Sequence, residues 1–144
     1  MKNLGDPKYF LGIEILRSQG GIFIRQKKYT LDLLVETGLL ECKPIDTPIM
    51  ANHGLQLIKG AKLADIGRYQ CLVGKHIYLA HARPDIAYVV GLVSQFMHQP
   101  QEDHLEAALR IVRYLRGTLG HGVLFGENGH QRIMDTHTLT GPAT

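Results

Sequence analysis

The 144-residue sequence has no tryptophan and only two cysteines, Cys42 and Cys71. Two cysteines are too few for a small secreted fold held together by disulfides. No apolar run reaches the roughly 20 residues that a membrane-spanning helix needs. The first residues also lack the basic and then apolar pattern of a secretory signal. The sequence therefore predicts an intracellular protein that is neither secreted nor bound to a membrane. It does not identify the compartment.

Apolar residues make up 44% of the chain and charged residues 20%. This composition is sufficient to bury a core, and the length is ordinary for one globular domain. Lysine and arginine exceed aspartate and glutamate by 16 to 13, so the formal net charge is +3. Such a mildly basic chain is compatible with a nucleic-acid partner but does not by itself indicate one.

The order of local patterns predicts an α+β fold that is mostly helical. Aromatic and β-branched residues on both sides of a Gly20-Gly21 turn predict a β-hairpin over residues 9–26, with a single first strand over 9–16. A short helix over 28–37 should follow and end at Gly38. Its predicted inward residues are Leu31, Leu34 and Val35. Residues 1–40 form one predicted unit, and residues 41–64, with Pro44, Pro48, Gly54 and Gly60, form an extended connector.

Three helices are predicted over residues 65–117 as a compact bundle. The first, over 65–82, has Asp65 as its N-cap and ends before Pro84. Its predicted inner face consists of Ile66, Tyr69, Val73, Ile77 and Ala80. The second, over 85–97, is apolar nearly all round and is expected at the buried centre. The third, over 103–116, has a leucine-rich stripe, and a short hairpin over 118–133 and a tail over 134–144 follow it.

The chain offers few metal ligands at useful spacing. Cys71, His76 and His81 lie five residues apart on one predicted helix. Each is therefore rotated by about 140° from the one before, and the three side chains cannot converge on one ion. The sequence also has no CxxC or HExxH motif. We therefore predict no metal site.

Candidate catalytic carboxylates are equally sparse. Asp32 and Glu36 have the spacing of a solvated helix face. Asp85 stands at a predicted helix start, where a carboxylate is an ordinary stabiliser. No nucleophile or phosphate-loop motif is present. The sequence therefore predicts no catalytic residue and no cofactor.

Arg110, Arg113 and Arg116 recur every three residues opposite the leucine stripe of the third bundle helix. Guanidinium groups in such a row are suited to phosphates. The alternative is that Glu106 pairs with Arg110 and that the later arginines complement the helix C-terminus. Composition alone favours this alternative.

Gly74 interrupts the first bundle helix at a cost of about 1 kcal/mol relative to alanine. Gln70, Gly74 and Tyr78 stand four residues apart and form a nearly straight track along the helix surface. A small residue between an amide and a phenol would let the helix approach a groove closely. The alternative is a close crossing with another helix at Gly74, and the sequence does not decide between the two.

Several stretches, in the same order, resemble the reverse transcriptase of copia-type LTR retrotransposon polyproteins. They are MKNLG at 1–5, KYFLGIEI at 8–15, GIFIRQKKY at 21–29, GRYQCLVGK at 67–75, YLAHARPDIAY at 78–88, SQFMH at 94–98 and RYLRGT at 113–118. The resemblance covers residues 1 to about 133 and is far more specific than any of the single motifs.

The resemblance implies roles for two segments. The hairpin that contains Phe10, Leu11 and Gly12 resembles the primer grip, which holds the end of the growing strand. Residues 70–78 are similar to the thumb helix of retroviral reverse transcriptases, whose matching glutamine, glycine and aromatic residues follow the minor groove of the template–primer duplex. Cys71 and His76 depart from the family, which often has a basic and an aliphatic residue there. These departures imply a lost phosphate contact and weaker packing.

The family's palm aspartates, in a Tyr-Val-Asp-Asp motif, lie upstream of the first residue of this chain, and Met1 coincides with an internal methionine of the family pattern. Because polymerisation needs such carboxylates to hold metal ions, the resemblance implies a catalytically incomplete fragment of a parent enzyme that would use Mg. The implied partners are an RNA–DNA or DNA duplex, bound without sequence preference, and the missing palm of a related polyprotein. The alternatives are a helical protein-interaction module and a translated relic without function.

The tail over 134–144 departs from the family, which continues into an RNase H domain through Gly-Tyr-Thr-Asp-Ala-Asp-Trp-Ala-Gly. One choice of codons for this tail, read two bases later, encodes Gly-Tyr-Thr-His-Ala-Asp-Trp-Ala-Gly-Asn. We therefore expect that a frameshift near Ile133 produced the tail.

Overall fold

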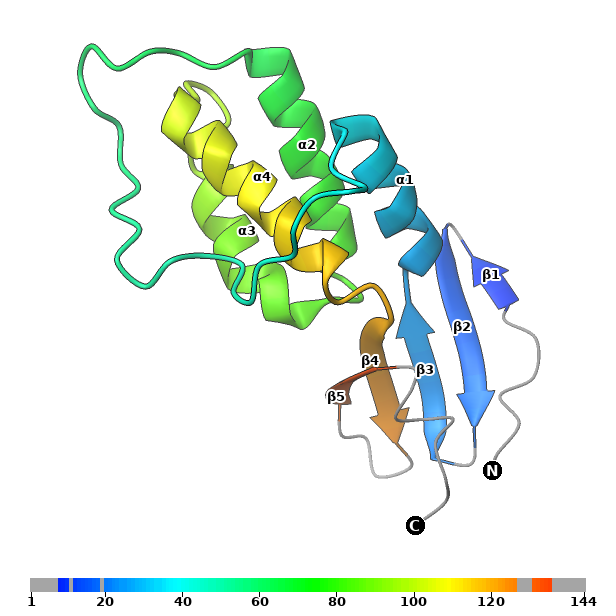
Figure 1. Cartoon of the computed structure of the whole chain (residues 1–144). Helices are drawn as coiled ribbons and strands as arrows, with labels where there is room; N and C mark the ends of the chain where they lie inside the picture. Colours follow the sequence, from blue (N-terminus) through cyan, green and yellow to red (C-terminus); the bar gives the residue numbers. More distant parts are fainter. Residues whose placement is uncertain (1–7, 11, 19, 127–130, 136–144) are drawn as a thin grey trace.

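The computed structural model describes residues 8–10, 12–18, 20–126 and 131–135. The elements in this part of the chain are strands β1 (Lys8–Phe10), β2 (Ile13–Ser18) and β3 (Gly21–Arg25), helices α1 (Lys27–Thr37) and α2 (Ile66–Leu79), the 3-10 turn η1 (Pro84–Ile86), helices α3 (Ala87–Ser94) and α4 (Glu102–Arg116), and strands β4 (His121–Gly126) and β5 (Gln131–Asp135). The predicted α+β class is confirmed. Figure 1 shows the helices gathered at one end of the molecule and the sheet at the other.

The strands form one antiparallel sheet in the order β1-β2-β3-β4-β5. The predicted C-terminal hairpin is present as β4 and β5, with Val123 opposite Ile133, and its last residue is Asp135 rather than residue 133. The sequence did not predict that this hairpin extends the N-terminal one. Ile24 of β3 lies opposite both Ile15 and Val123, so strands from the two ends of the chain are joined.

The predicted single strand over 9–16 is wrong, because the chain turns back at Gly12. Gly12 has a φ of 82°, a conformation that ends a strand and that glycine adopts at little cost. Phe10 and Ile13 therefore face each other across a tight turn between β1 and β2. The predicted hairpin over 9–26 corresponds to β2 and β3, with β1 added at its edge.

Glycine is required where β3 and β4 approach each other. A Cβ atom on Gly122 would lie 2.2 Å from the Ile24 carbonyl oxygen and 2.9 Å from Phe23 Cζ. The Phe23 ring, which is fully buried, occupies the space that a side chain at Gly122 would need.

We expect Gly122→Ala to lower the free energy of unfolding by roughly 1–3 kcal/mol, because a backbone carbonyl cannot yield as a side chain can. Urea titration followed by circular dichroism would measure the loss. Gly91→Ala is the matched control, since a Cβ atom there meets nothing within 4 Å. The control should be neutral or slightly stabilising, as alanine favours a helix. Equal stability of Gly122→Ala and the parent chain would contradict the close approach of β3 and β4.

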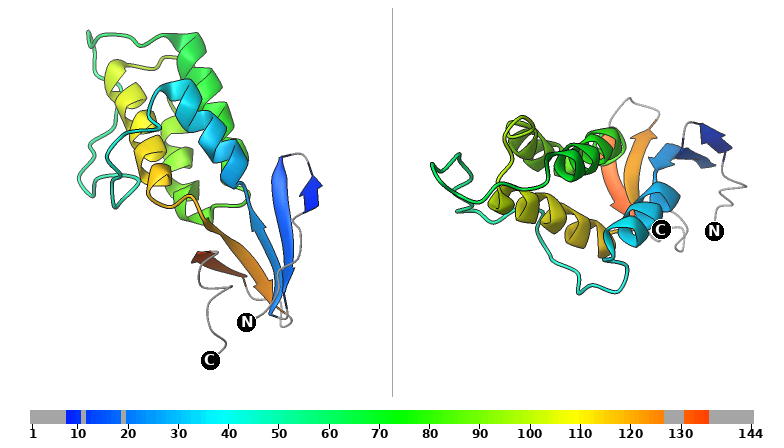
Figure 2. Two further views of the ribbon diagram at one scale, coloured as in Figure 1. Left: turned by 45° about the vertical axis from the view of Figure 1, so that its right-hand side comes forward. Right: turned by 90° about the horizontal axis from the view of Figure 1, so that it is seen from above.

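The main core lies between the four helices. Leu34 of α1, Val73 of α2, Val89 of α3 and Ile111 of α4 are almost completely buried in it. A smaller cluster of Leu16, Phe23 and Leu124 lies on the sheet. Figure 2 shows in two further views that the helices pack together beside the sheet.

Two predicted inner faces need correction. In α1, Val35 is 63% exposed, and Leu33 is buried in its place. In α2, Ile66 and Ile77 are 48% and 42% exposed. The residues that α2 does bury are Tyr69, Leu72, Val73, His76 and Leu79. Both helices carry apolar residues on two faces, so periodicity alone did not identify the face that meets α4.

The second bundle helix also differs from its prediction. It is split into η1 and α3, which ends at Ser94 rather than at residue 97. Val89, Val90 and Val93 are buried, but Tyr88 is 71% exposed, so α3 is not buried all round. None of the helices in the described ranges has the length and apolar content needed to cross a bilayer.

Candidate nucleic-acid interface

Helix α2 presents the predicted track on its outer side. Asp65 caps the helix as predicted, and its carboxylate accepts a hydrogen bond from the Arg68 backbone N–H at 3.1 Å. Because the Tyr69 and Val73 side packs into the core, the opposite side faces outward. Gln70 and Gly74 are exposed there, and Tyr78 is half-buried at the end of the helix.

The surroundings of Gly74 bear on one of its two predicted roles, the close crossing with another helix. A Cβ atom built on Gly74 meets no heavy atom within 4 Å. Gly74 therefore does not lie at a close crossing with another helix. It leaves a shallow, open stretch of helix surface, and an external groove can approach the backbone there.

The amide of Gln70 is partly used within the chain. Its Nε2 atom donates a hydrogen bond to the Met97 carbonyl oxygen at 2.8 Å, which ties α2 to the segment after α3. Lys75, next to Gly74, donates a hydrogen bond from Nζ to Glu36 Oε2 on α1. This bond to Glu36 raises the pKa of Lys75, although burial acts against it. Lys75 is thus a paired cation beside the track.

The other end of the track meets the β1–β2 turn. A Cβ atom on Gly12 would lie 3.7 Å from the Tyr78 hydroxyl oxygen and 3.9 Å from Tyr29 Cδ1. The predicted contact residue Gly12 and the predicted track residue Tyr78 are therefore neighbours, although they are far apart in the sequence. Leu11 lies outside the described residues, and of Phe10 only the backbone is described, as the last residue of β1.

Tyr29 was missed by sequence reasoning. Its ring centroid lies 5.0 Å from that of Tyr78, with the planes tilted by 57°. Burial raises the pKa of the Tyr29 hydroxyl, against an opposing effect of the nearby Lys75 charge. A tyrosine in the first turn of a helix gives no local signal of this contact, because the contact depends on where α2 ends.

Glu14, in the motif that resembles a primer grip, fixes α1 on the hairpin. It is 4% exposed, and it lies opposite Arg25 in the β2–β3 register. Its carboxylate accepts hydrogen bonds from Arg25 Nε and from the Lys28 backbone N–H, each at 3.2 Å. A buried carboxylate at this helix start satisfies an otherwise unpaired N–H and holds the first turn of α1 in place.

The three arginines of α4 are separate from the track in their contacts. Arg110 donates from Nη2 to Thr47 Oγ1 at 3.1 Å, and Arg116 donates from Nε to the Leu40 carbonyl at 2.7 Å. The Arg113 carbonyl accepts from the Ile45 backbone N–H at 3.4 Å. These contacts attach the connector (residues 41–64) and the residue before it to α4.

The alternative predicted for these arginines is present in part, since Arg113 and Arg116 lie in the last turn of α4. Among the described residues, Glu106 makes no ion pair with Arg110 or with any other cation. Arg110 and Arg116 are half-buried residues, and each guanidinium group donates a hydrogen bond within the chain, to Thr47 and to Leu40. Sequence periodicity could not show that the connector contacts this side of α4, through Thr47 and Ile45.

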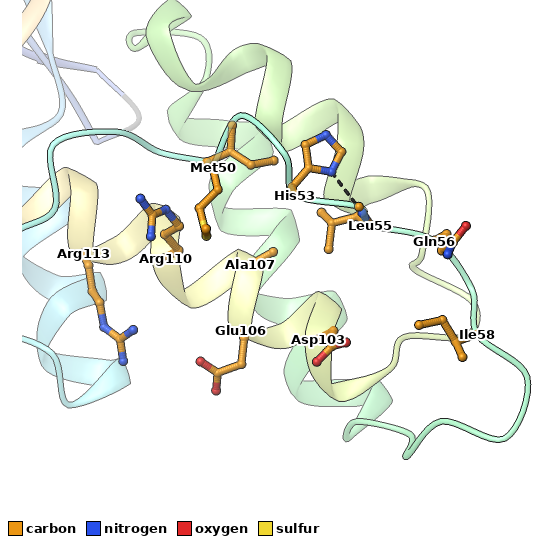
Figure 3. Close-up of a pocket in the computed structure, with 12 residues that line it drawn as sticks. Met50, His53, Leu55, Gln56, Ile58, Asp103, Glu106, Ala107, Arg110 and Arg113 are labelled. Carbon is orange, nitrogen blue, oxygen red and sulfur yellow. Dashed lines mark hydrogen bonds between the residues drawn. The ribbon is translucent and has the colours of Figure 1, made fainter.

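A hollow of about 300 Å³ lies between the connector and α4. Figure 3 shows Arg110, Glu106 and Asp103 on the α4 side and His53 and Leu55 on the connector side, where the Leu55 N–H donates to His53 Nδ1 at 3.0 Å. The hollow borders Arg110 and Arg113, and no residue of the Gln70–Gly74–Tyr78 track lines it.

Hydrogen bonds that the sequence did not predict attach the connector to the start of α4. Gln101 donates from Nε2 to the Ile58 carbonyl at 2.7 Å and accepts the Ile58 N–H at 3.1 Å. His104 Nδ1 accepts the Gln101 N–H, and Nε2 lies 2.9 Å from the Gln56 carbonyl oxygen. The His104 ring stacks on Phe96 with centroids 3.8 Å apart. A Gln-x-x-His sequence before an apolar run resembles a capping box and was the available signal.

The potential metal ligands remain scattered. His76 is fully buried, whereas Cys71 and His81 are exposed. Over the part of the chain that the structure describes, no group of three histidine, cysteine or acidic side chains is arranged to hold a metal ion. The carboxylates of Glu14 and Asp85 are both engaged with arginines.

The chain is similar to mobile-element proteins. It is 49% identical over 123 residues to the Retrovirus-related Pol polyprotein from transposon RE1 of Arabidopsis thaliana, which is 85% of this chain and 8% of that polyprotein. It is 46% identical to the corresponding polyprotein of transposon RE2, over the same shares. An uncharacterized mitochondrial protein of the same plant is 38% identical over 92% of this chain and 55% of that protein. No family model and no solved structure matches the chain.

Proposed function

Because the chain belongs to the copia-type retrotransposon Pol polyproteins, of which it spans a small part, we propose that it is their primer-grip and thumb segment. In this proposal it binds a template–primer-like duplex without sequence preference and does not polymerise DNA. The sequence has no Tyr-Val-Asp-Asp motif to hold the metal ions of polymerisation.

The observation that best supports this proposal is the open surface at Gly74. The helix backbone is accessible at the middle of the track, with an amide on one side and a phenol on the other. A minor groove offers similar hydrogen-bond acceptors at every base pair, so contacts made there discriminate poorly between sequences. The Gly12 turn lies directly at the Tyr78 end, where the same duplex would continue.

The alternative of a helical interaction module has less support. That alternative requires the apolar residues of the second bundle helix to be available to a partner. Val89, Val90 and Val93 of α3 instead belong to the core.

We expect Gly74→Leu to weaken binding of a short RNA–DNA hybrid by about tenfold, or ~1.4 kcal/mol, because the leucine side chain fills the open surface. Fluorescence anisotropy with a labelled hybrid would measure it. The free energy of unfolding should rise, since leucine is a better helix former than glycine. Loss of binding without loss of stability identifies an interface.

Ala51→Leu is the matched control for added bulk, because Ala51 is an exposed residue of the connector. It should leave the affinity unchanged. Unchanged affinity of Gly74→Leu, or an equal loss in Ala51→Leu, would contradict a duplex interface on α2.

The proposed phosphate contacts of the α4 arginines have their own test. If Arg113 neutralises a phosphate, Arg113→Ala should reduce the slope of log Kd against log salt by about one unit. Arg116→Ala removes a hydrogen bond to Leu40 as well. A parallel thermal melt therefore separates loss of the connector contact from loss of a phosphate contact. An unchanged slope in both variants would show that Arg113 and Arg116 do not contact phosphates.

A further inference from the structure

Helices α1 and α2 both reach the Gly12 turn between β1 and β2, each through a tyrosine. Tyr29 comes from the first turn of α1 and Tyr78 from the last turn of α2. The Tyr29 ring and the Tyr78 hydroxyl group lie within ordinary van der Waals distance of the position that a Cβ atom on Gly12 would take. The tilted arrangement of the rings is the one that aromatic pairs prefer over a flat sandwich.

The two tyrosines are held differently. Tyr29 packs against the helical core, and the adjacent Lys28 backbone N–H is bonded to the buried carboxylate of Glu14. Tyr29 is therefore tied to both the core and the hairpin. Among the described residues, the ring neighbours of Tyr78 are Tyr29 and His81, and its centroid is 6.2 Å from that of His81. His81 is exposed, whereas Tyr29 packs against the helical core, so Tyr29 is the better anchored of these two rings.

We propose that Tyr29 is a positioning residue, which holds Tyr78 against the Gly12 turn so that the turn and the α2 track form one continuous surface. The use of that surface by a duplex rests on the proposed function, whereas the support of Tyr78 by Tyr29 does not. Tyr29 acts through Tyr78 and needs no contact with nucleic acid itself.

The first test is independent of nucleic acid. In the full chain, nuclear Overhauser effects between the Tyr78 ring and the Gly12 Hα protons report their proximity. We expect these signals to be lost in Tyr29→Leu, which keeps apolar volume, and retained in Tyr29→Phe, which keeps the ring. Persistence of the signals in Tyr29→Leu would overturn the proposal.

The second test uses a labelled RNA–DNA hybrid and a double-mutant cycle. Tyr29→Leu should weaken binding by about fivefold, within the range of one aromatic pair. In the Tyr78→Ala background, the same change should have no further effect on binding, because Tyr29 then has nothing to position. An equal loss in both backgrounds would show that Tyr29 acts only on overall stability and would overturn its positioning role.

The two tests also separate the two proposals. If the parent chain binds no hybrid, the proposed function fails, and the magnetic-resonance result alone decides the role of Tyr29. If the parent chain binds and Tyr29→Leu keeps both its affinity and its Tyr78–Gly12 signals, the duplex interface stands and the positioning role is wrong.

Discussion

Arg83→Met should lower the free energy of unfolding by about 3–5 kcal/mol, because it leaves a carboxylate uncompensated in a largely buried site. Arg83 is 2% exposed and makes a two-bond contact with Asp85, at 3.0 Å from Nε and 2.7 Å from Nη2. It also donates to the Thr118 carbonyl and hydroxyl oxygens, after the end of α4. The Tyr114 hydroxyl donates to Asp85 at 2.6 Å. One guanidinium thus joins η1 to the C-terminal end of α4.

The acidity of Asp85 reflects the same contacts. Burial by itself would raise the pKa of this carboxyl group, but the hydrogen bonds and charge of Arg83, with the Tyr114 hydroxyl, outweigh it and hold the pKa below its usual value. The stabilisation is therefore present above the ordinary aspartate range and is lost as the pH falls through the lowered value. The sequence predicted Asp85 only as a helix-start stabiliser.

Two further variants distinguish the buried Arg83–Asp85 pair from an exposed ion pair by their loss of stability. Lys28→Met breaks the exposed Lys28–Asp32 pair, whose side chains are 71% and 64% exposed, and should cost less than about 1 kcal/mol. Asp85→Asn combined with Arg83→Met should be less destabilising than Arg83→Met alone, since no unpaired charge remains. Chemical denaturation provides all of these values. An Arg83→Met loss no larger than that of Lys28→Met would contradict the buried network.

The second large expected effect is a loss of folding stability in acid that depends on His76. The imidazole is fully buried, and its Nε2 lies 2.9 Å from the Ala108 carbonyl oxygen on α4. Its Nδ1 is buried without a hydrogen-bond partner. Burial lowers the pKa of His76 to about 4, against a smaller opposing effect of the Ala108 carbonyl. The folded chain therefore keeps this histidine neutral, with its N–H on Nε2.

The sign of the pH effect follows from the lowered pKa. Above about pH 6.5, neither the folded nor the unfolded chain protonates the imidazole, and its effect on stability does not vary. Between about pH 6.5 and 4, only the unfolded chain takes up the proton, so stability falls with the pH by about 3 kcal/mol in total. Below about pH 4, both states are protonated and the dependence ends.

The free energies of unfolding of the parent chain and of His76→Leu, measured across this pH range, isolate the contribution of His76 to the pH dependence of stability. The difference between the two pH profiles should grow as the pH falls, because leucine cannot take up a proton. His98→Asn, which replaces an exposed histidine, should follow the parent profile. Parallel profiles for His76→Leu and the parent chain would contradict a neutral buried histidine. The family resemblance implied weaker packing at His76. In the structure the ring is fully buried, with one hydrogen bond to α4 and no partner at Nδ1.

Local signals in the sequence predicted several helix ends well. Gly38 ends α1 with a φ of 73°, and Asp65 caps α2, both as expected. Helix α4 was predicted within one residue at its start. Caps and terminating glycines act over a few residues, so a sequence contains the information that places them.

Contacts between distant segments could not be predicted in the same way. The β3–β4 pairing and the Gly12–Tyr78 contact each join residues far apart in the chain. The position of the connector over Arg110 and Arg116 depends on a segment without periodicity. For the candidate site, the sequence therefore predicted the track on α2 and named Gly12 as a contact candidate. It did not predict the turn at Gly12, its proximity to Tyr78 or the part of Tyr29.

The salt dependence of duplex binding by the unmodified chain is the direct test of the proposed duplex interface. Each phosphate that the protein neutralises releases counterions, so a groove-and-phosphate interface should lose affinity by about 100-fold between roughly 50 and 200 mM salt. The affinities for hybrids of unrelated sequence should agree. An affinity that stays flat over this range, or one that depends strongly on sequence, would contradict the proposed duplex interface.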